Sequence, residues 1–329
     1  MNGIAWRYLY SKPDSAFYFA QLAYNFSSSA GYNKYMSKAL NTQGVSFAIR
    51  SDYTRALIYY KKNLKLQDKI GDKNEIANSF NNIGAIYYNQ SNYDEALIYF
   101  KKSLNIKVKS GDKIDIARGL NNIGNIYANQ SDFTKSMDYY TRSLKIFKEI
   151  SDKYGIANSL SNIGDIYEIQ SNYDKALIYF KKSLKISKEI EDKYGVALTL
   201  GNIGNIYKKL SSFQKALKYL LEAYNLSKQI NALDLVSEHC KALYEIYKKA
   251  GKNNKALEMY ELYMFSDGYI DQFGGNNNEK FNIKRFKRML LEIHEKDIEE
   301  QEKIISTTMK KWKGEQKQID DILVIGIKL

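Results

Sequence analysis

Four asparagine residues recur along the chain at intervals of forty residues. They are Asn82, Asn122, Asn162 and Asn202. A side-chain amide carries two N–H donors and one carbonyl acceptor, so it can pair with both the N–H and the C=O of an extended peptide, whatever side chains that peptide has. Three further polar residues follow these asparagines by three positions, and we interpret them as positions that determine specificity. They are Asn125, Asp165 and Asn205.

The segments that carry the asparagines repeat as a unit with two helices. Asn81–Tyr87 and Asn92–Phe100 each return three more times at forty-residue spacing. Apolar residues fall at helical intervals in both segments, which predicts one helix for each. With Phe80 numbered as position 4, the small residues Gly84 and Ala96 stand at positions 8 and 20, where they let two helix backbones approach closely. The four asparagines then stand at position 6, opposite the core face of the first helix.

This pattern of a large residue, Gly, an aromatic residue, Ala and a second aromatic residue resembles the tetratricopeptide repeat (TPR), in a forty-residue variant similar to that of kinesin light chain and many bacterial signalling proteins. The resemblance implies an all-α fold, a TPR superhelical solenoid of helix-turn-helix repeats with a C-terminal helical extension. In related TPR proteins the position-6 face lines a concave groove, and Asn there holds the main chain of a ligand. The alternative is that these asparagines cap turns, bond neighbouring helices or face water, because they would also recur through repeat duplication.

The domain organisation follows from the repeats, since each unit touches only its neighbours and one long array is natural. A Gly- and Asn-rich cluster at Gly274–Asn278 predicts a boundary. We therefore expect a TPR array over 1–270, a linker over 271–280, and a helical extension with a short apolar tail over 281–329. The expected units are 1–30 (partial), 33–70, 73–110, 113–150, 153–190, 193–230 and 232–267 (divergent).

Composition argues against several functional classes. The chain has one Cys and two His, which excludes an internal disulfide and speaks against a Cys/His metal site; we expect Cys240 to be a small buried residue. No Gly-rich phosphate loop, HExxH motif or nucleophile elbow is present. We therefore expect no enzymatic activity, no catalytic residues, no cofactor and no bound metal.

The net charge of +13 invites a nucleic-acid interpretation, but its placement argues against one. The lysine pairs at residues 61–62, 101–102 and 181–182 stand opposite the core face of the second helices, where we expect a solvated outer surface. Tyr59 and its equivalents at forty-residue spacing, Tyr99, Tyr139, Tyr179 and Tyr219, stand beside the core face, where we expect packing rather than recognition.

The leading functional hypothesis is a non-catalytic protein- or peptide-binding scaffold that recognises an extended segment in the groove. The alternative is the truncated sensory region of a bacterial TPR-containing histidine kinase or another signalling protein, since repeats followed by a charged helix and an apolar run resemble that class. Expected partners are a protein or peptide, with no nucleic acid, no membrane span within the chain and a homodimer through the C-terminal helix. A cytoplasmic location is expected, although a truncated start would hide an export signal.

Overall fold

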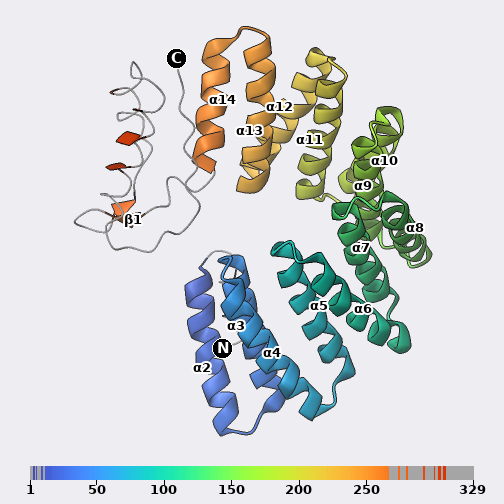
Figure 1. Ribbon diagram of the computed structural model, residues 1–329, viewed down its shortest axis with the longest axis vertical. Coiled ribbons are helices and arrows are strands. Elements are labelled where there is room, and N and C mark those ends of the chain that lie inside the picture. The colour runs from blue at the N-terminus through green and yellow to red at the C-terminus, as the bar shows by residue number, and fades with distance from the viewer. Residues whose placement is uncertain are drawn as a thin grey trace. The chain divides into compact units, whose positions relative to one another are not determined.

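The computed structural model describes residues 12–266 and, outside this range, only residues 3, 5, 9, 273–274, 279–280, 292, 300, 303–304 and 307–308. Within these residues the chain forms thirteen α-helices joined by turns of two or three residues (Figure 1). Their bounds are α2 Pro13–Ser29, α3 Asn33–Ile49, α4 Tyr53–Ile70, α5 Lys73–Asn89, α6 Tyr93–Ser110, α7 Lys113–Asn129, α8 Phe133–Glu149, α9 Lys153–Ile169, α10 Tyr173–Glu189, α11 Lys193–Lys209, α12 Phe213–Gln229, α13 Leu233–Lys249 and α14 Asn253–Ser266. The expected all-α fold of consecutive helix-turn-helix repeats is confirmed.

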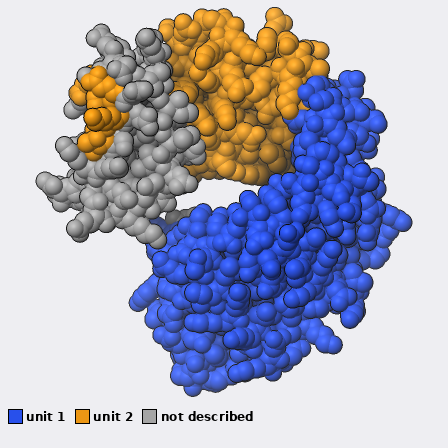
Figure 2. Space-filling view, in the orientation of Figure 1, with its two compact units in different colours: residues 1–186 blue, residues 187–329 orange. Residues whose placement is uncertain are grey.

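The chain divides into two compact units, residues 1–186 and residues 187–329 (Figure 2). Unit 1 holds α2 to α9 and most of α10, and unit 2 holds α11 to α14. Within unit 1, each helix from α2 to α8 packs on the next helix along the chain. Within unit 2, α11 to α14 pack in the same consecutive order. The domain boundary expected near residue 270 stays a prediction.

The turn between the two helices of a repeat is short because one residue belongs to both helix ends. Ser91 adopts the left-handed conformation (φ 58°). Its N–H bonds to the Tyr88 carbonyl oxygen at 2.8 Å, and the N–H of Asn92 bonds to the Tyr87 carbonyl oxygen at 2.9 Å, the Schellman pattern of a helix C-terminus. Asn92 then caps α6, because its side chain accepts from the backbone N–H of Glu95. Asn92 therefore takes part both in the end of α5 and in the start of α6, which keeps the connection short.

Glycine at position 8 allows the two helices to pack closely in the five repeats from α3 to α12, whereas the α13–α14 repeat has Tyr244 at this position. A Cβ atom added at Gly124 would lie 2.6 Å from Cε1 of Tyr140, closer than any real Cβ contact. Gly84, Gly164 and Gly204 lie as closely against Phe100, Phe180 and Leu220. The residue at position 24 of the second helix therefore occupies the space where a side chain at position 8 would stand.

Stacked aromatic rings join the two helices of a repeat. Tyr87 of α5 stacks on Tyr99 of α6 with ring centroids 5.5 Å apart. The same stack recurs as Phe47–Tyr59, Tyr127–Tyr139, Tyr167–Tyr179 and Tyr207–Tyr219. The packing role expected for these tyrosines is confirmed.

The expected lysine pairs of the second helices are exposed. One lysine of each pair lies over a tyrosine ring of the aromatic stacks: the Nζ atom of Lys102 is 5.1 Å from the ring centroid of Tyr99, and that of Lys182 is 5.4 Å from the centroid of Tyr179. These lysines are therefore solvated and also make cation–π contacts, which the sequence pattern did not indicate.

The C-terminal expectations are only partly within the described residues. In the expected linker at 271–280, β1 (Phe273–Gly274) pairs antiparallel with β2 (Glu279–Lys280). The linker expected at 271–280 stays a prediction, and the Gly- and Asn-rich sequence between the two strands is of the kind that connects hairpin strands. The helical extension expected at 281–329 lies outside the described residues except for six isolated positions, which are helical.

In unit 2, two neighbouring residues of α13 are buried without charge. Cys240 is 0% exposed, as expected for a small core residue, and burial raises the pKa of its thiol to about 12. The imidazole of His239 packs against Gly201 of α11, and its Nδ1 lies 3.1 Å from Oγ of Ser227. Because that hydroxyl donates to the Ala223 carbonyl oxygen, its oxygen can accept a hydrogen bond from the Nδ1–H of the neutral imidazole. Burial lowers the pKa of His239 from 6.5 to about 4, outweighing the opposite effect of the Asp234 carboxylate.

We predict that Gly124→Ala destabilises unit 1 by about 1–3 kcal/mol, because the new methyl group forces the buried Tyr140 ring to move. The control is Gly119→Ala on the same helix, where the added Cβ would meet only the end of the Leu104 side chain, at 3.2 Å. Thermal unfolding followed by circular dichroism should show a lower midpoint for Gly124→Ala and an unchanged or higher one for Gly119→Ala. Equal midpoints for the two variants would contradict the packing role of position 8.

A second prediction concerns the pH dependence of stability. The unfolded chain takes up a proton on His239 below about pH 6.5, whereas the folded chain does so only near pH 4, so the neutral form stabilises the fold above pH 6.5 and this stabilisation is lost as the pH falls toward 4. The loss is about 3 kcal/mol in total. His239→Gln cannot titrate, so the difference in unfolding midpoint between wild type and this variant should shrink from pH 7 to pH 4.5. A difference that stays constant over this range would contradict the assignment.

Candidate functional site

The position-6 asparagines of unit 1 are bonded to the preceding repeat. Nδ2 of Asn82 in α5 donates to Oδ1 of Asn41 in α3 at 2.8 Å. One repeat later, Nδ2 of Asn122 in α7 donates to Oδ1 of Asn81 in α5 at 3.0 Å. Consecutive first helices are therefore joined by pairs of amides, which is the neighbour-bonding alternative for these two residues. Each donating amide still keeps its carbonyl oxygen and one N–H.

The other two position-6 asparagines differ from this pattern. Asn162 of α9 is half-buried, and within the described residues it makes no hydrogen bond. Its expected partner Asn121 instead bonds with Ser159, which lies one turn earlier in α9, at 3.2 Å. Asn202 is also half-buried and belongs to unit 2. All four side chains are thus accessible in part, as a role in ligand binding requires.

The face of α7 carries further amides that are held in place by tyrosines. Oδ1 of Asn125 accepts a hydrogen bond of 2.5 Å from the Tyr140 hydroxyl of α8. One turn on, Nδ2 of Asn129 donates to the Tyr88 hydroxyl at 2.8 Å and to the main-chain oxygen of Asn125 at 2.9 Å. Together with Asn122 these residues form a row along one side of α7, which we call the α7 amide row (Asn122, Asn125 and Asn129). Side chains fixed in this way lose little conformational entropy when a ligand binds.

The remaining expected specificity residues have different surroundings. Asp165 is half-buried on α9, and its charge contributes to raising the pKa of Tyr140, although desolvation of the tyrosine is the larger cause. Asn205 of α11 is half-buried, and its Oδ1 is buried with no hydrogen-bond partner among the described residues. The three position-9 residues are therefore not equivalent.

Sequence reasoning missed the partners that hold these amides. Tyr140 was not singled out, although it is a tyrosine at position 24 where Phe100 and Phe180 stand in the neighbouring repeats. Helical spacing puts Asn129 and Tyr88 on the faces of their helices that carry the asparagines, but nothing in the sequence pairs them. Pairing could be found only from the distance between first helices of successive repeats.

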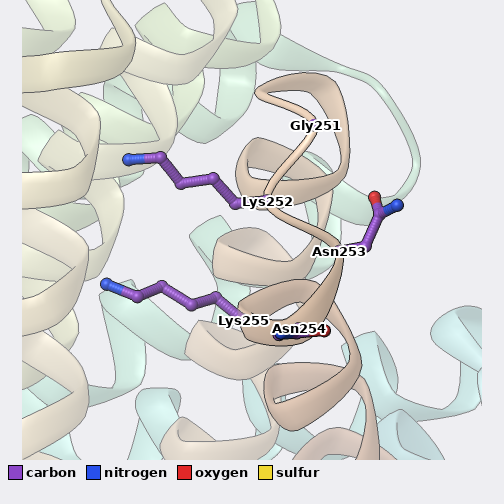
Figure 3. A pocket seen from close by; sticks show the side chains of 5 residues that line it. All are labelled: Gly251, Lys252, Asn253, Asn254 and Lys255. Carbon is purple, nitrogen blue, oxygen red and sulfur yellow. The ribbon is translucent and has the colours of Figure 1, made fainter.

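A small pocket lies apart from this face, at the start of α14. It has a volume of about 340 Å³ and is lined by Gly251 to Lys255. Figure 3 shows Lys252 and Lys255 extending to one side and Asn253 to the other. The Nζ atom of Lys255 lies 5.7 Å from the ring centroid of Tyr247. The pocket consists of one turn and one helix start, and no side-chain hydrogen bonds like those of the α7 amide row are found among its described residues.

Two further observations bear on the chemistry. Within the described part of the chain, no group of three or more His, Cys, Asp or Glu side chains is arranged to hold a metal ion. Nor does any helix in that part have the length and apolar character needed to span a bilayer.

We predict that the two half-buried asparagines Asn122 and Asn162 differ in their contribution to stability. Asn122→Ala removes the donor to Asn81 and should lower the free energy of unfolding by about 1 kcal/mol. Asn162→Ala removes no hydrogen bond within the described residues and should have a smaller effect. Thermal unfolding midpoints of the two variants provide the test, and a larger loss for Asn162→Ala would contradict the bonding described above.

Solved structures of similar fold have low sequence identity to this chain. The apo form of RapI is 18% identical, with 80% of this chain and 94% of that chain covered and a TM-score of 0.64. Aspartyl phosphate phosphatase F from Bacillus subtilis is 15% identical, with 93% and 77% covered and a TM-score of 0.61. A Rap protein complexed with competence and sporulation factor is 15% identical, with 70% and 74% covered and a TM-score of 0.52. These similarities show the fold.

The sequence itself identifies the family. No curated protein matches the chain. The tetratricopeptide repeat family matches residues 35–107, 115–189 and 156–229, which together make up more than half of the chain. These ranges include the first helices that carry the four asparagines and the second helices that pack on them. The chain therefore belongs to the tetratricopeptide repeat family.

Proposed function

We propose that the protein is a non-catalytic scaffold that binds an extended segment of a peptide or partner protein along its first helices. The observation that carries this proposal is the α7 amide row with the amide pairs beside it. The face offers neutral donors and acceptors, and these are the groups that pair with a peptide main chain.

The charge distribution supports the same face. The second helix α4 carries five Lys or Arg residues against one Asp, whereas the first helix α5 carries one Lys and one Glu. A face with little net charge is expected to recognise a partner through hydrogen bonds rather than through the partner's charge. The similarity in fold to a Rap protein that has been solved with competence and sporulation factor adds to the case for a ligand-binding array.

The sensor-kinase alternative rests on residues 280–329. The structure describes only a few isolated positions there, and the matches reported above add nothing to it. The expected homodimer through the same segment is likewise without support in the described residues. Neither idea is favoured by a specific contact.

The test is a selection of peptides from a random heptapeptide display library on the wild-type protein, followed by affinity measurement with the selected peptide. The variant Asn82→Ala/Asn122→Ala/Asn162→Ala/Asn202→Ala should bind at least about tenfold more weakly, because each lost main-chain hydrogen bond contributes about 1 kcal/mol.

The matched control is Asn105→Ala/Asn225→Ala, which removes two exposed amides of the second helices α6 and α12. It should bind as wild type does, and circular dichroism should show both variants folded. Equal affinity of the wild type and the four-residue variant would show that the asparagines bind neighbouring helices and not a ligand.

A further inference from the structure

Two asparagines at the same position of their repeats differ in one contact. Asn125 and Asn205 both stand at position 9, on α7 and α11. Oδ1 of Asn125 accepts a 2.5 Å hydrogen bond from the hydroxyl of Tyr140. Oδ1 of Asn205 is buried and has no partner in the part of the chain that the structure describes. The position-9 asparagine is thus held by a hydrogen bond to its Oδ1 in one repeat, whereas in the other repeat its Oδ1 receives no such bond.

The difference arises from the residue at position 24 of the second helix. It is Tyr140 behind Asn125 and Leu220 behind Asn205. Gly124 leaves room for the Tyr140 ring, whose Cε1 atom lies 2.6 Å from the place of a Cβ at that glycine. The ring therefore passes close under the first helix, and its hydroxyl reaches position 9 from the core side. Phe100 and Phe180 fill the same space in neighbouring repeats but carry no hydroxyl.

The hydroxyl determines which end of the Asn125 amide faces the ligand side. An asparagine without partners can exchange its oxygen and nitrogen by rotation about its last bond. Tyr140 is 3% exposed, and burial raises the pKa of its hydroxyl, so the hydroxyl stays protonated and acts as a donor. A donor on Oδ1 leaves Nδ2 as the free end, and Nδ2 has no hydrogen-bond partner within the described residues.

Asn122 supplies the complementary group on the same face. Its Nδ2 donates to Oδ1 of Asn81, so its own Oδ1 is an acceptor of fixed position. Residues three apart on a helix are neighbours, with Cβ atoms about 5–6 Å apart. The α7 amide row thus offers one acceptor and one donor side by side, and each is held by a protein hydrogen bond.

We propose that Tyr140 is a positioning residue that orients Asn125 so that its Nδ2 donates to a main-chain carbonyl oxygen of the ligand, while Oδ1 of the adjacent Asn122 accepts a main-chain N–H. The pair therefore fixes the direction in which an extended segment crosses α7. This inference rests on the proposed function, because it names how that site recognises its peptide. Asn205, which lacks a tyrosine behind it, does not have this fixed orientation.

The first experiment tests the orientation without any ligand. Protein labelled with ¹⁵N-asparagine gives side-chain amide signals, and Asn125→Ala identifies those of Asn125. Tyr140→Phe keeps the ring and should shift the Asn125 signals and speed their hydrogen exchange, while the exposed Asn105 signals stay in place. Leu220→Tyr should conversely slow the exchange of the Asn205 side-chain amide. Unchanged Asn125 signals in Tyr140→Phe would overturn the positioning role.

The second experiment tests the consequence for binding, with the heptapeptide selected on the wild type. Tyr140→Phe should bind it about five- to tenfold more weakly. Replacing single peptide amides by esters should reveal one carbonyl whose change weakens wild-type binding but has a smaller effect on Tyr140→Phe. Because a merely structural role of Tyr140 would weaken every peptide of the series alike, equal ester effects in the two proteins would overturn the proposal.

The outcomes separate this inference from the proposed function. Selection of no peptide, or of one that binds the four-asparagine variant as tightly as wild type, would overturn the proposed function and with it the ligand role of Asn125. A peptide that depends on the four asparagines but binds Tyr140→Phe at wild-type affinity would overturn this inference alone.

Discussion

The close approach of the two helices in each of the five repeats from α3 to α12 is the constraint on which the rest of the structure depends. It requires a glycine at position 8, because the ring or branched side chain at position 24 already occupies the space of a Cβ atom. Core packing allows little adjustment, so this contact determines the spacing of the helices. It also determines which side chain reaches the amides of the first helix: the ring of Tyr140 passes by Gly124, and its hydroxyl bonds to Asn125.

The asparagines on the first helices bond successive repeats to one another and are still partly exposed. The amide pairs Asn82–Asn41 and Asn122–Asn81 join consecutive first helices, yet each amide keeps groups that are not used between repeats. A half-buried amide that is already hydrogen-bonded is held in one orientation. Its side chain therefore loses little conformational entropy when a ligand binds its remaining groups. Structural bonding and ligand binding are therefore compatible roles for one residue, and the two interpretations of the asparagines are not exclusive.

The two faces of the repeats have different electrostatic character. The paired lysines of the second helices are exposed, and one of each pair lies over a tyrosine ring, which places positive charge on the exposed surface of these helices. The first helix α5, by contrast, carries several amides and only one Lys and one Glu. The positive charge on the second helices is thus separated from the amides of the first helices.

The sequence alone determined the period, the two helices per repeat, the small residue at position 8 and the position-6 asparagines, because helical periodicity and repetition are local patterns that survive without tertiary contacts. It also indicated that Cys240 is buried. Only the tertiary structure decided which amide bonds to which, for example that Asn121 bonds to Ser159 while Asn122 bonds to Asn81. It likewise showed that Tyr140 reaches Asn125 and that Asn205 lacks such a donor. These contacts depend on ångström-scale distances between helices far apart in the sequence, and hydrogen bonds are sensitive to such distances whereas residue patterns are not.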